Sequence, residues 1–493
     1  MSDLRIALIG YSDWLGYGHG ERADAWLARL DVNRAELDAF RAASMPACAP
    51  YSPAATTVAP ADGSKAGEAR PLLADAAAAL ARAAQHADLH AFTWLPDAVP
   101  AHAEGFLAGV PVAIKDLMAV ADVPLSAGSA AFDRRPAAAD AEIVARLKRA
   151  GAVVIGMTNL HEFAYGITSD NPRFGRVVNP VAPGRIPGGS SGGSAAAIAA
   201  GIVRAAVGTD TAGSIRIPAA CCGITGFKPS YDALPRTGVL DLATSLDHVG
   251  PMGRSVEDCA ALFAAMLDLR AIPTWMVPDL SGIAVGRLRG FFEHPLDGDV
   301  RDAVDAASVA LANDGARCID QQVEGIELAG AIQFNTICAE ASAVHAERLR
   351  ERGDRIGEDV RVRLEIGQFL PGPWYVKAQR MRTQLVAQME ALFVDADVLV
   401  CPTLRTPAPP LGAVRIDIDG ASYPLHTVVT GLTLPFNLAG LPTVSIPWSR
   451  SREGAPVSLQ VVGARGADWR TLAVAQRLQA AAPWHQQFAV SSR

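Results

Sequence analysis

The sequence predicts an α/β fold, a β-sheet covered by helices on both faces, on three observations. Half of the 493 residues are hydrophobic and 19% are charged, which is the balance of a large globular protein and not of a disordered chain. Short apolar runs typical of buried strands alternate with segments of helical periodicity. No unit repeats along the chain.

The first 71 residues are expected to form an N-terminal extension to a domain spanning residues 72–493. Residues 5–9 predict a short strand, and residues 21–43 have helical periodicity with an apolar face that needs a partner, either the core or a second copy of the chain. Residues 45–71, rich in Pro, Ala, Ser and Thr, predict a linker. Glu21 stands where a dinucleotide-binding fingerprint needs its third glycine, so this region is interpreted as structural.

Beyond residue 72 the elements follow in alternation. An alanine-rich helix comes first, and buried strands are expected at 91–94, 110–114, 152–155, 397–400 and 443–446. Residues 141–150 predict a helix. The most apolar long window, residues 192–208, is interrupted by Arg204 and predicts a buried core helix, not a membrane span.

Charge and cysteine usage exclude several classes of function. The net charge of −7 does not suit a nucleic-acid binder. The seven cysteines are odd in number and scattered, without C-x-x-C spacing or a cluster with histidine. They predict a reducing cytoplasm and no metal site. The N-terminus lacks a basic leader and a cleavage site, so a secretory signal is not expected.

The first of three informative segments is GVPVAIKDLMAV, where Lys115 follows the apolar run 110–114. The chain has only five lysines among its 44 basic residues, and lysine, unlike arginine, can be neutralised by burial. A buried Lys115 would have a lowered pKa and could act as a base. Spacing alone favours the alternative, a strand-end lysine that reaches solvent and pairs with Asp116.

The second and third segments combine serines with small residues. PGGSSGGSAAAIAAG at 187–201 would let main-chain N–H groups approach a ligand, yet it lacks the lysine of a nucleotide-binding loop. A flexible turn is the alternative. GTDTAGSIRIPAACCG at 208–223 could direct successive N–H groups at one point, as an oxyanion hole requires, or could form a turn that only binds its own backbone.

Together the three segments resemble the signature of the amidase signature family, serine hydrolases that include amidases, allophanate hydrolase and the A-type subunits of tRNA-dependent amidotransferases. Lys115, Ser190 and Ser214 stand in the family's order, 75 and 24 residues apart. The resemblance continues through residues 158–180, 226–230, 245–258, 401–412 and 436–447 and covers roughly residues 72–450. It implies the family's fold, a large mixed sheet core with helices on both faces, and makes residues 72–493 the catalytic domain.

The resemblance implies amide hydrolysis by a Ser-Ser-Lys triad through an acyl-enzyme, without cofactor or metal. Ser214 is the implied nucleophile, Ser190 the bridging serine and Lys115 the base. The implied oxyanion hole consists of the N–H groups of Thr211, Ala212, Gly213 and Ser214, and the implied peptide bond before Ser190 is cis. Asp210 and Arg216 are expected to form a buried structural pair that orients this loop.

The substrate is less well defined. Ser191 and Arg382 are candidate substrate-binding residues, since Arg382 falls where the A-type subunits of amidotransferases have an arginine that grips a carboxylate; an exposed helical arginine is the alternative. Thr430 occupies a position that is commonly acidic in those proteins. Two functions remain open, a free-standing amidase and a glutaminase subunit of an amidotransferase complex. The expected partner is a small-molecule amide in the cytoplasm, without nucleic acid or membrane, and a homodimer is left open.

Overall fold

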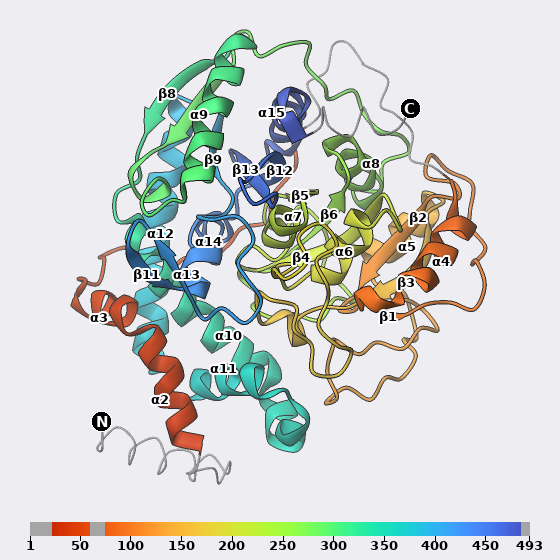
Figure 1. The fold of residues 1–493 in the computed structure, drawn as a ribbon. Helices are drawn as coiled ribbons and strands as arrows, with labels where there is room; N and C mark the ends of the chain where they lie inside the picture. The colour runs from red at the N-terminus through yellow and green to blue at the C-terminus, as the bar shows by residue number, and fades with distance from the viewer. Residues whose placement is uncertain (1–21, 60–73, 485–493) are drawn as a thin grey trace.

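The computed structural model describes residues 22–59 and 74–484, and its centre is an 11-stranded mixed sheet (Figure 1). In spatial order the strands are β1 (Phe92–Trp94), β3 (Val153–Thr158), β2 (Pro111–Lys115), β4 (Ala205–Asp210), β6 (His248–Gly253), β5 (Thr225–Lys228), β12 (Thr443–Arg450), β13 (Pro456–Gly463), β9 (Val398–Pro402), β7 (Ala284–Leu288) and β8 (Arg317–Gln321). A separate hairpin pairs β10 (Arg415–Ile418) with β11 (Ala421–Pro424).

Parallel and antiparallel pairs are mixed within this sheet. β2 runs parallel to β3 and β4, and β7 runs parallel to β8 and β9, whereas β6, β5, β12 and β13 join these parts by antiparallel pairing. Because β2 and β4 are parallel neighbours, their carboxyl ends lie at the same edge of the sheet. Open α/β sheets commonly place ligands at this edge.

The helices lie on both faces of the sheet. They are α2 (Ala23–Val32), α3 (Arg34–Ala42), α4 (Ala76–Gln85), α5 (Glu142–Arg149), α6 (Gly192–Ala199), α7 (Arg216–Cys222), α8 (Val256–Met266), α9 (Gly298–Asn313), α10 (Ala329–Arg352), α11 (Glu358–Gln368), α12 (Gly372–Ala391), α13 (Leu425–Thr430), α14 (Leu434–Leu438) and α15 (Asp468–Ala481). Successive strand residues point to opposite faces. Along β2, Val112 and Ile114 pack in the core cluster that holds α5 and α8, and Ala113 packs in the cluster with α4 and α6. The predicted architecture is confirmed.

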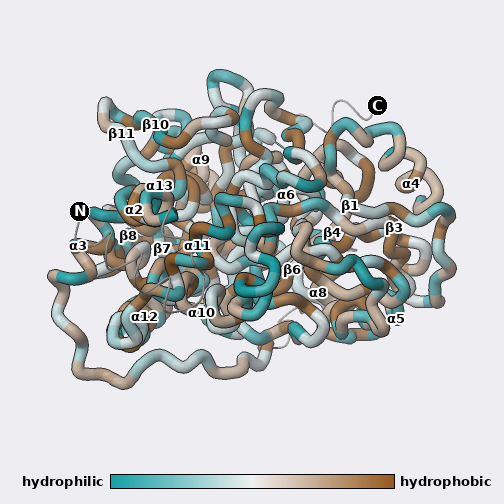
Figure 2. The backbone as a smooth tube through the Cα atoms, turned by 90° about the horizontal axis from the view of Figure 1, so that it is seen from below, coloured by the Kyte–Doolittle hydropathy of each residue, from teal (hydrophilic) through white to brown (hydrophobic). Residues whose placement is uncertain are grey.

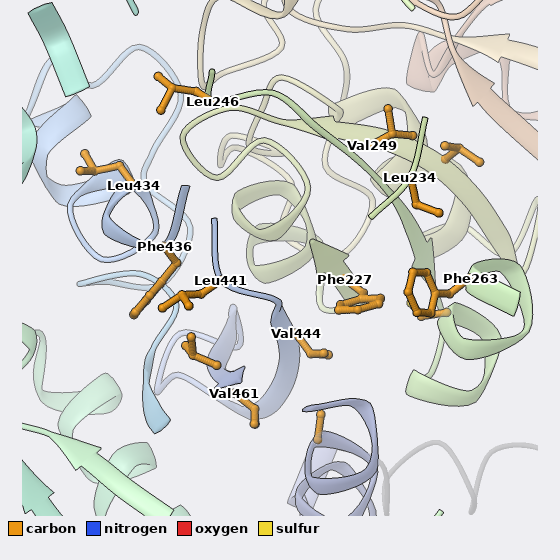
Figure 3. Packing of buried hydrophobic residues seen from close by; sticks show 14 of the residues in the cluster. Phe227, Leu234, Leu246, Val249, Phe263, Leu434, Phe436, Leu441, Val444 and Val461 are labelled. Atoms are coloured by element: carbon orange, nitrogen blue, oxygen red, sulfur yellow. The ribbon is translucent and has the colours of Figure 1, made fainter. Parts of the chain in front are cut away.

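The larger core cluster includes residues of the strands in the middle of the sheet and of the helices that pack on them. Phe227 of β5 meets Phe263 of α8 edge to face at 5.1 Å between ring centroids, and Val444 of β12 lies in the same cluster (Figure 3). Hydrophobic residues recur along the inner strands and helices in Figure 2, and hydrophilic residues along much of the outer loops. Burial of this apolar surface is the main force that fixes the sheet.

The expected strands at 91–94, 110–114, 152–155, 397–400 and 443–446 are confirmed as β1, β2, β3, β9 and β12, and the two helices after residue 72 as α4 and α5. The single core helix expected at 192–208 is wrong. That window contains α6 and then β4, with Gly201 at φ +73° just after the helix. An unbroken apolar run has no periodicity that separates a helix from a buried strand.

The helix expected at 21–43 is two helices. Asn33 interrupts the pattern, because its N–H donates to the carbonyl of Leu30 while its own carbonyl accepts from Leu37. Asparagine favours such cap positions over helix interiors. The strand expected at residues 5–9 lies outside the described residues.

Candidate active site

Lys115 ends β2 and is fully buried, with its amine surrounded by hydroxyl groups. The Nζ atom lies 2.7 Å from Ser190 Oγ, 2.9 Å from Ser191 Oγ and 2.7 Å from Thr209 Oγ1. The side chain of Asp116 makes its hydrogen bonds elsewhere. The interpretation of Lys115 as a solvent-exposed partner of Asp116 is therefore wrong, and the structure brings the first two sequence segments together.

Burial shifts the proton affinity of this lysine. Removal from water disfavours the ammonium and lowers the pKa of Lys115 to about 7, although the charges of Asp210 and Asp247 act in the opposite direction. A neutral amine has two N–H donors and one lone pair, whereas the ammonium has three donors. Because each hydroxyl can donate or accept, the three hydroxyls satisfy both forms. The site can therefore hold or release a proton at Nζ.

The glycine–serine loop reaches Lys115 through a backbone path that glycine permits. Gly188 has φ +75°, and a Cβ there would lie 2.7 Å from Pro218 Cα. The Gly189–Ser190 peptide bond is cis, as expected. The two serines come directly before α6, so their positions are set by the packing of that helix against the sheet.

The third segment forms a tight turn around one carboxylate. Asp210, at the end of β4, accepts hydrogen bonds from the N–H of Gly213 at 2.8 Å and of Ile215 at 3.1 Å. Gly213 has φ +127°, a conformation that side chains strongly disfavour. The turn presents Ser214 with 6% exposure, and its carbonyl accepts from the N–H of Ser191 at 3.2 Å.

The expected oxyanion hole needs one correction. The N–H of Gly213 already donates to Asp210, so it is not free for a ligand. Across residues 22–59 and 74–484, the N–H groups of Thr211, Ala212 and Ser214 donate to no protein acceptor. These three, and not four, are the available donors at this turn.

The expected structural pair of Asp210 and Arg216 is confirmed. Both side chains are fully buried, and Arg216 Nη2 lies 3.0 Å from Asp210 Oδ1. Burial alone would raise the pKa of Asp210, but the charge and hydrogen bonds of Arg216 hold it well below its usual range. Arg216 also donates to Asn437 Oδ1 at 2.6 Å and to the carbonyl of Thr433 at 3.0 Å. The pair thus ties the turn to the segment that contains α14.

Arg216→Met is expected to lower the free energy of unfolding by about 3–5 kcal/mol, because it leaves the Asp210 carboxylate buried without a cation. The matched control is Arg176→Met, which breaks an exposed pair with Asp170 and should cost about 0–1 kcal/mol. Urea denaturation followed by circular dichroism measures both. Equal losses in the two variants would show that the buried pair does not stabilise the fold.

Ser214 opens into a cavity of about 570 Å³. Its wall includes Thr211 and Ala212 beside the serine, residues 161–168 after β3, parts of α10 and α11, and the segment that contains α13. The N-terminal helices also contribute to the wall. A substrate in this cavity would lie directly against the serine and the three available N–H groups.

The two candidate substrate-binding residues lie elsewhere. Arg382 is fully buried in α12 and lies outside the cavity lining, where it donates to the carbonyl of Leu438 at 2.7 Å and to Ser245. It is neither an exposed helical arginine nor part of the cavity wall. Ser191 is also absent from the lining, because its hydroxyl contacts Lys115 and donates to the carbonyl of Thr209 at 3.2 Å.

Two residues of the site are missed by sequence reasoning. Thr209 places a third hydroxyl on Lys115, and Asp247 accepts a hydrogen bond from Thr211 Oγ1 at 2.6 Å and from the N–H of Leu242 at 2.7 Å. Burial raises the pKa of Asp247 to about 7. Thr209 directly precedes the DTAGS run, so its position next to the expected turn was the available signal. For Asp247 the sequence offered no signal apart from its position in the SLDHVG segment.

The described residues offer neither a metal-binding cluster nor a helix suited to a membrane. Within residues 22–59 and 74–484, no group of three His, Cys, Asp or Glu side chains is arranged to hold a metal ion. No helix in the same ranges combines the length and apolar character that crossing a membrane requires.

Comparison with known proteins agrees with this geometry. The model of the Amidase family matches residues 72–472. The chain is 38% identical to AtzE of Pseudomonas sp. (strain ADP), a subunit of 1-carboxybiuret hydrolase, over 73% of this chain and 80% of that protein. It is 37% identical to the A-type subunit of the glutamyl-tRNA(Gln) amidotransferase of Halorhodospira halophila, over 78% and 85%. A crystal structure of an amidase superposes with a TM-score of 0.76 at 34% identity, covering 82% of this chain and 94% of the other. The chain therefore belongs to the amidase signature family, whose members hydrolyse C–N amide bonds.

Proposed function

We propose that the protein hydrolyses a carboxylic amide to an acid and an amine or ammonia through an acyl-enzyme on Ser214. The observation that carries the proposal is the contact of a fully buried lysine amine with Ser190 Oγ at 2.7 Å, next to the turn that directs Ser214 into a cavity. A buried amine with a pKa near 7 suits a general base. The expected cytoplasmic location and a homodimer stay predictions.

In the proposed reaction these groups act in sequence. Neutral Lys115 takes the proton of Ser190 as Ser190 takes that of Ser214, and Ser214 Oγ bonds to the amide carbon. The N–H groups of Thr211, Ala212 and Ser214 stabilise the oxyanion. The C–N bond then breaks, and the proton returns along the relay to the leaving nitrogen. Water attacks the ester with the same relay as base, releasing the acid and restoring Ser214.

A second candidate function is the glutaminase step of an amidotransferase complex. It is supported by the 37% identity to the A-type amidotransferase protein of Halorhodospira halophila, 85% of which this chain matches. A chain with this role would depend on its complex for turnover, whereas a free-standing amidase would not.

Turnover by the purified chain tests the proposal. We expect release of ammonia or amine from at least one member of an amide panel, with the intact mass of the protein rising by one acyl group when hydrolysis is quenched. A chain that is active only on glutamine and only with partner proteins would favour the glutaminase. Absence of turnover on every amide, together with absence of an acyl adduct, would contradict both functions.

The pH dependence of kcat/KM should report the base. Protonated Lys115 cannot accept a proton, so kcat/KM should fall about tenfold per pH unit below pH 7 and level off above it. In Asp247→Asn the falling part of the profile, its acidic limb, should move to lower pH, because the carboxylate no longer raises the pKa of Lys115. Complete loss of the limb in Asp247→Asn would assign it to Asp247 instead. Profiles between pH 5 and 9 decide this.

A further inference from the structure

The N-terminal helices form one wall of the cavity, although they precede the residues matched by the family model. α2 packs on α11: Trp26 is fully buried, donates to Glu365 Oε2 at 2.7 Å, and meets Phe369 with ring centroids 4.8 Å apart. α3 places Phe40 against Trp374 of α12, at 5.9 Å between ring centroids. The apolar face expected on this segment therefore finds its partner in the core.

One cation of this wall has no partner among the described residues. Arg29 on α2 lines the cavity, and its Nε is buried without a hydrogen-bond acceptor. Within residues 22–59 and 74–484, its guanidinium forms no ion pair and no hydrogen bond with the protein. Burial lowers the pKa of Arg29, and the neighbouring Arg363 guanidinium lowers it further. An arginine keeps its charge under these conditions, so the wall holds a guanidinium whose N–H donors have no acceptor among the described residues.

Asp359 and Glu36 attract Arg29 from a distance, but neither carboxylate contacts its guanidinium. Asp359 is occupied by Arg363, at 2.6 Å, and by His161, at 3.1 Å. Burial raises the pKa of Glu36 and the charge of Arg29 acts in the opposite direction, but Glu36 forms no ion pair with Arg29. Glu327, the other acidic residue of the lining, is exposed. Arg29 is thus the cation of the wall whose N–H donors an incoming ligand can satisfy.

We propose that Arg29 binds a carboxylate on the acyl part of the substrate, so that the protein's substrates are amides whose acyl chain ends in an anionic group. The inference rests on the proposed function, because Ser214 and Arg29 line the same cavity. A guanidinium presents paired N–H donors that match the two oxygens of a carboxylate. In this arrangement the amide carbonyl of the substrate lies at Ser214 and its carboxylate at Arg29. The acyl chain that joins them lies against the apolar part of the cavity wall.

The kinetic test compares monoamides of dicarboxylic acids, with three to six carbons, against the unsubstituted amides of equal length. The native protein should prefer the anionic member of at least one pair by about tenfold or more in kcat/KM, since hydrogen bonds to charged groups are strong. Arg29→Met should bring that ratio close to one, mainly through KM. Arg34→Met is the matched control, an exposed arginine of α3 paired with Asp31, and should keep the ratio. A ratio that Arg29→Met leaves intact, or one that Arg34→Met abolishes equally, overturns the proposal.

A binding test separates this proposal from the proposed function. In a Ser214→Ala background, calorimetry should show that a dicarboxylate binds more tightly than the monocarboxylate of equal length, and that Arg29→Met removes the difference. Native-like melting of each variant confirms that it is folded. If no amide is turned over but the dicarboxylate still binds through Arg29, the hydrolase proposal fails and the anion site stands. Equal binding of the two acids overturns the anion site.

Discussion

Ser214→Ala is expected to lower kcat for amide hydrolysis by at least about ten-thousand-fold, because the hydroxyl supplies the only bond between protein and acyl group in the proposed reaction. Among the described residues, the Ser214 hydroxyl holds no other side chain by a hydrogen bond, so the melting temperature should stay close to that of the native protein. Steady-state kinetics on an amide from the panel measures the loss.

The matched control for that variant is Ser281→Ala, which removes the hydroxyl of an exposed serine outside the cavity lining. It should keep native activity. If Ser214→Ala retained more than about a hundredth of the native kcat, another group would have to be the nucleophile.

Lys115→Arg should be nearly as damaging as Lys115→Ala, with kcat reduced about a thousandfold or more in both. An arginine keeps the positive charge but does not release its proton at ordinary pH, so it cannot act as a base. The Lys115 amine is also fully buried among the hydroxyls of Ser190, Ser191 and Thr209, so the larger guanidinium group of an arginine has little space there. Comparison of the two variants separates the need for a proton acceptor from the need for a charge.

Lys148→Arg serves as the control, because Lys148 is partly exposed and pairs with Asp140 at 2.7 Å, where arginine is an adequate substitute. Its activity should match that of the native chain. Retention of most activity in Lys115→Arg would show that the lysine acts only as a charge and would exclude the neutral-base role.

The alternation of strands and helices could be predicted because buried strands and amphipathic helices leave different periods in the sequence. Where that contrast vanishes, prediction fails: the uniformly apolar residues 192–208 hide the change from α6 to β4. Asn33 divides the N-terminal helix by a local cap, which a periodicity count over 23 residues overlooks.

The candidate residues were predicted from order and spacing, but several of their contacts were not. The apolar run before Lys115 left its burial open, and its neighbours in sequence do not identify its partners, because the hydroxyls around it come from residues 75 to 94 positions away. The donation of the Gly213 N–H to Asp210 likewise depends on how the turn closes. Arg382 fits a family position by sequence, yet folding directs it to the carbonyl of Leu438. Arg29 carries no sequence signal, since an unpaired charge is defined only by its neighbours in space.

The central claim is that Ser214 is activated by a neutral Lys115, and a fluorophosphonate probe tests it most directly. The modified residue is identified by mass spectrometry of peptides, and the labelling rate is followed between pH 5 and 9 in the native chain and in Lys115→Arg. We predict a single adduct on Ser214, formed at a rate that rises with pH up to about 7, and almost no adduct in Lys115→Arg. An adduct on Ser190, or equal labelling rates in the two chains, would contradict the claim.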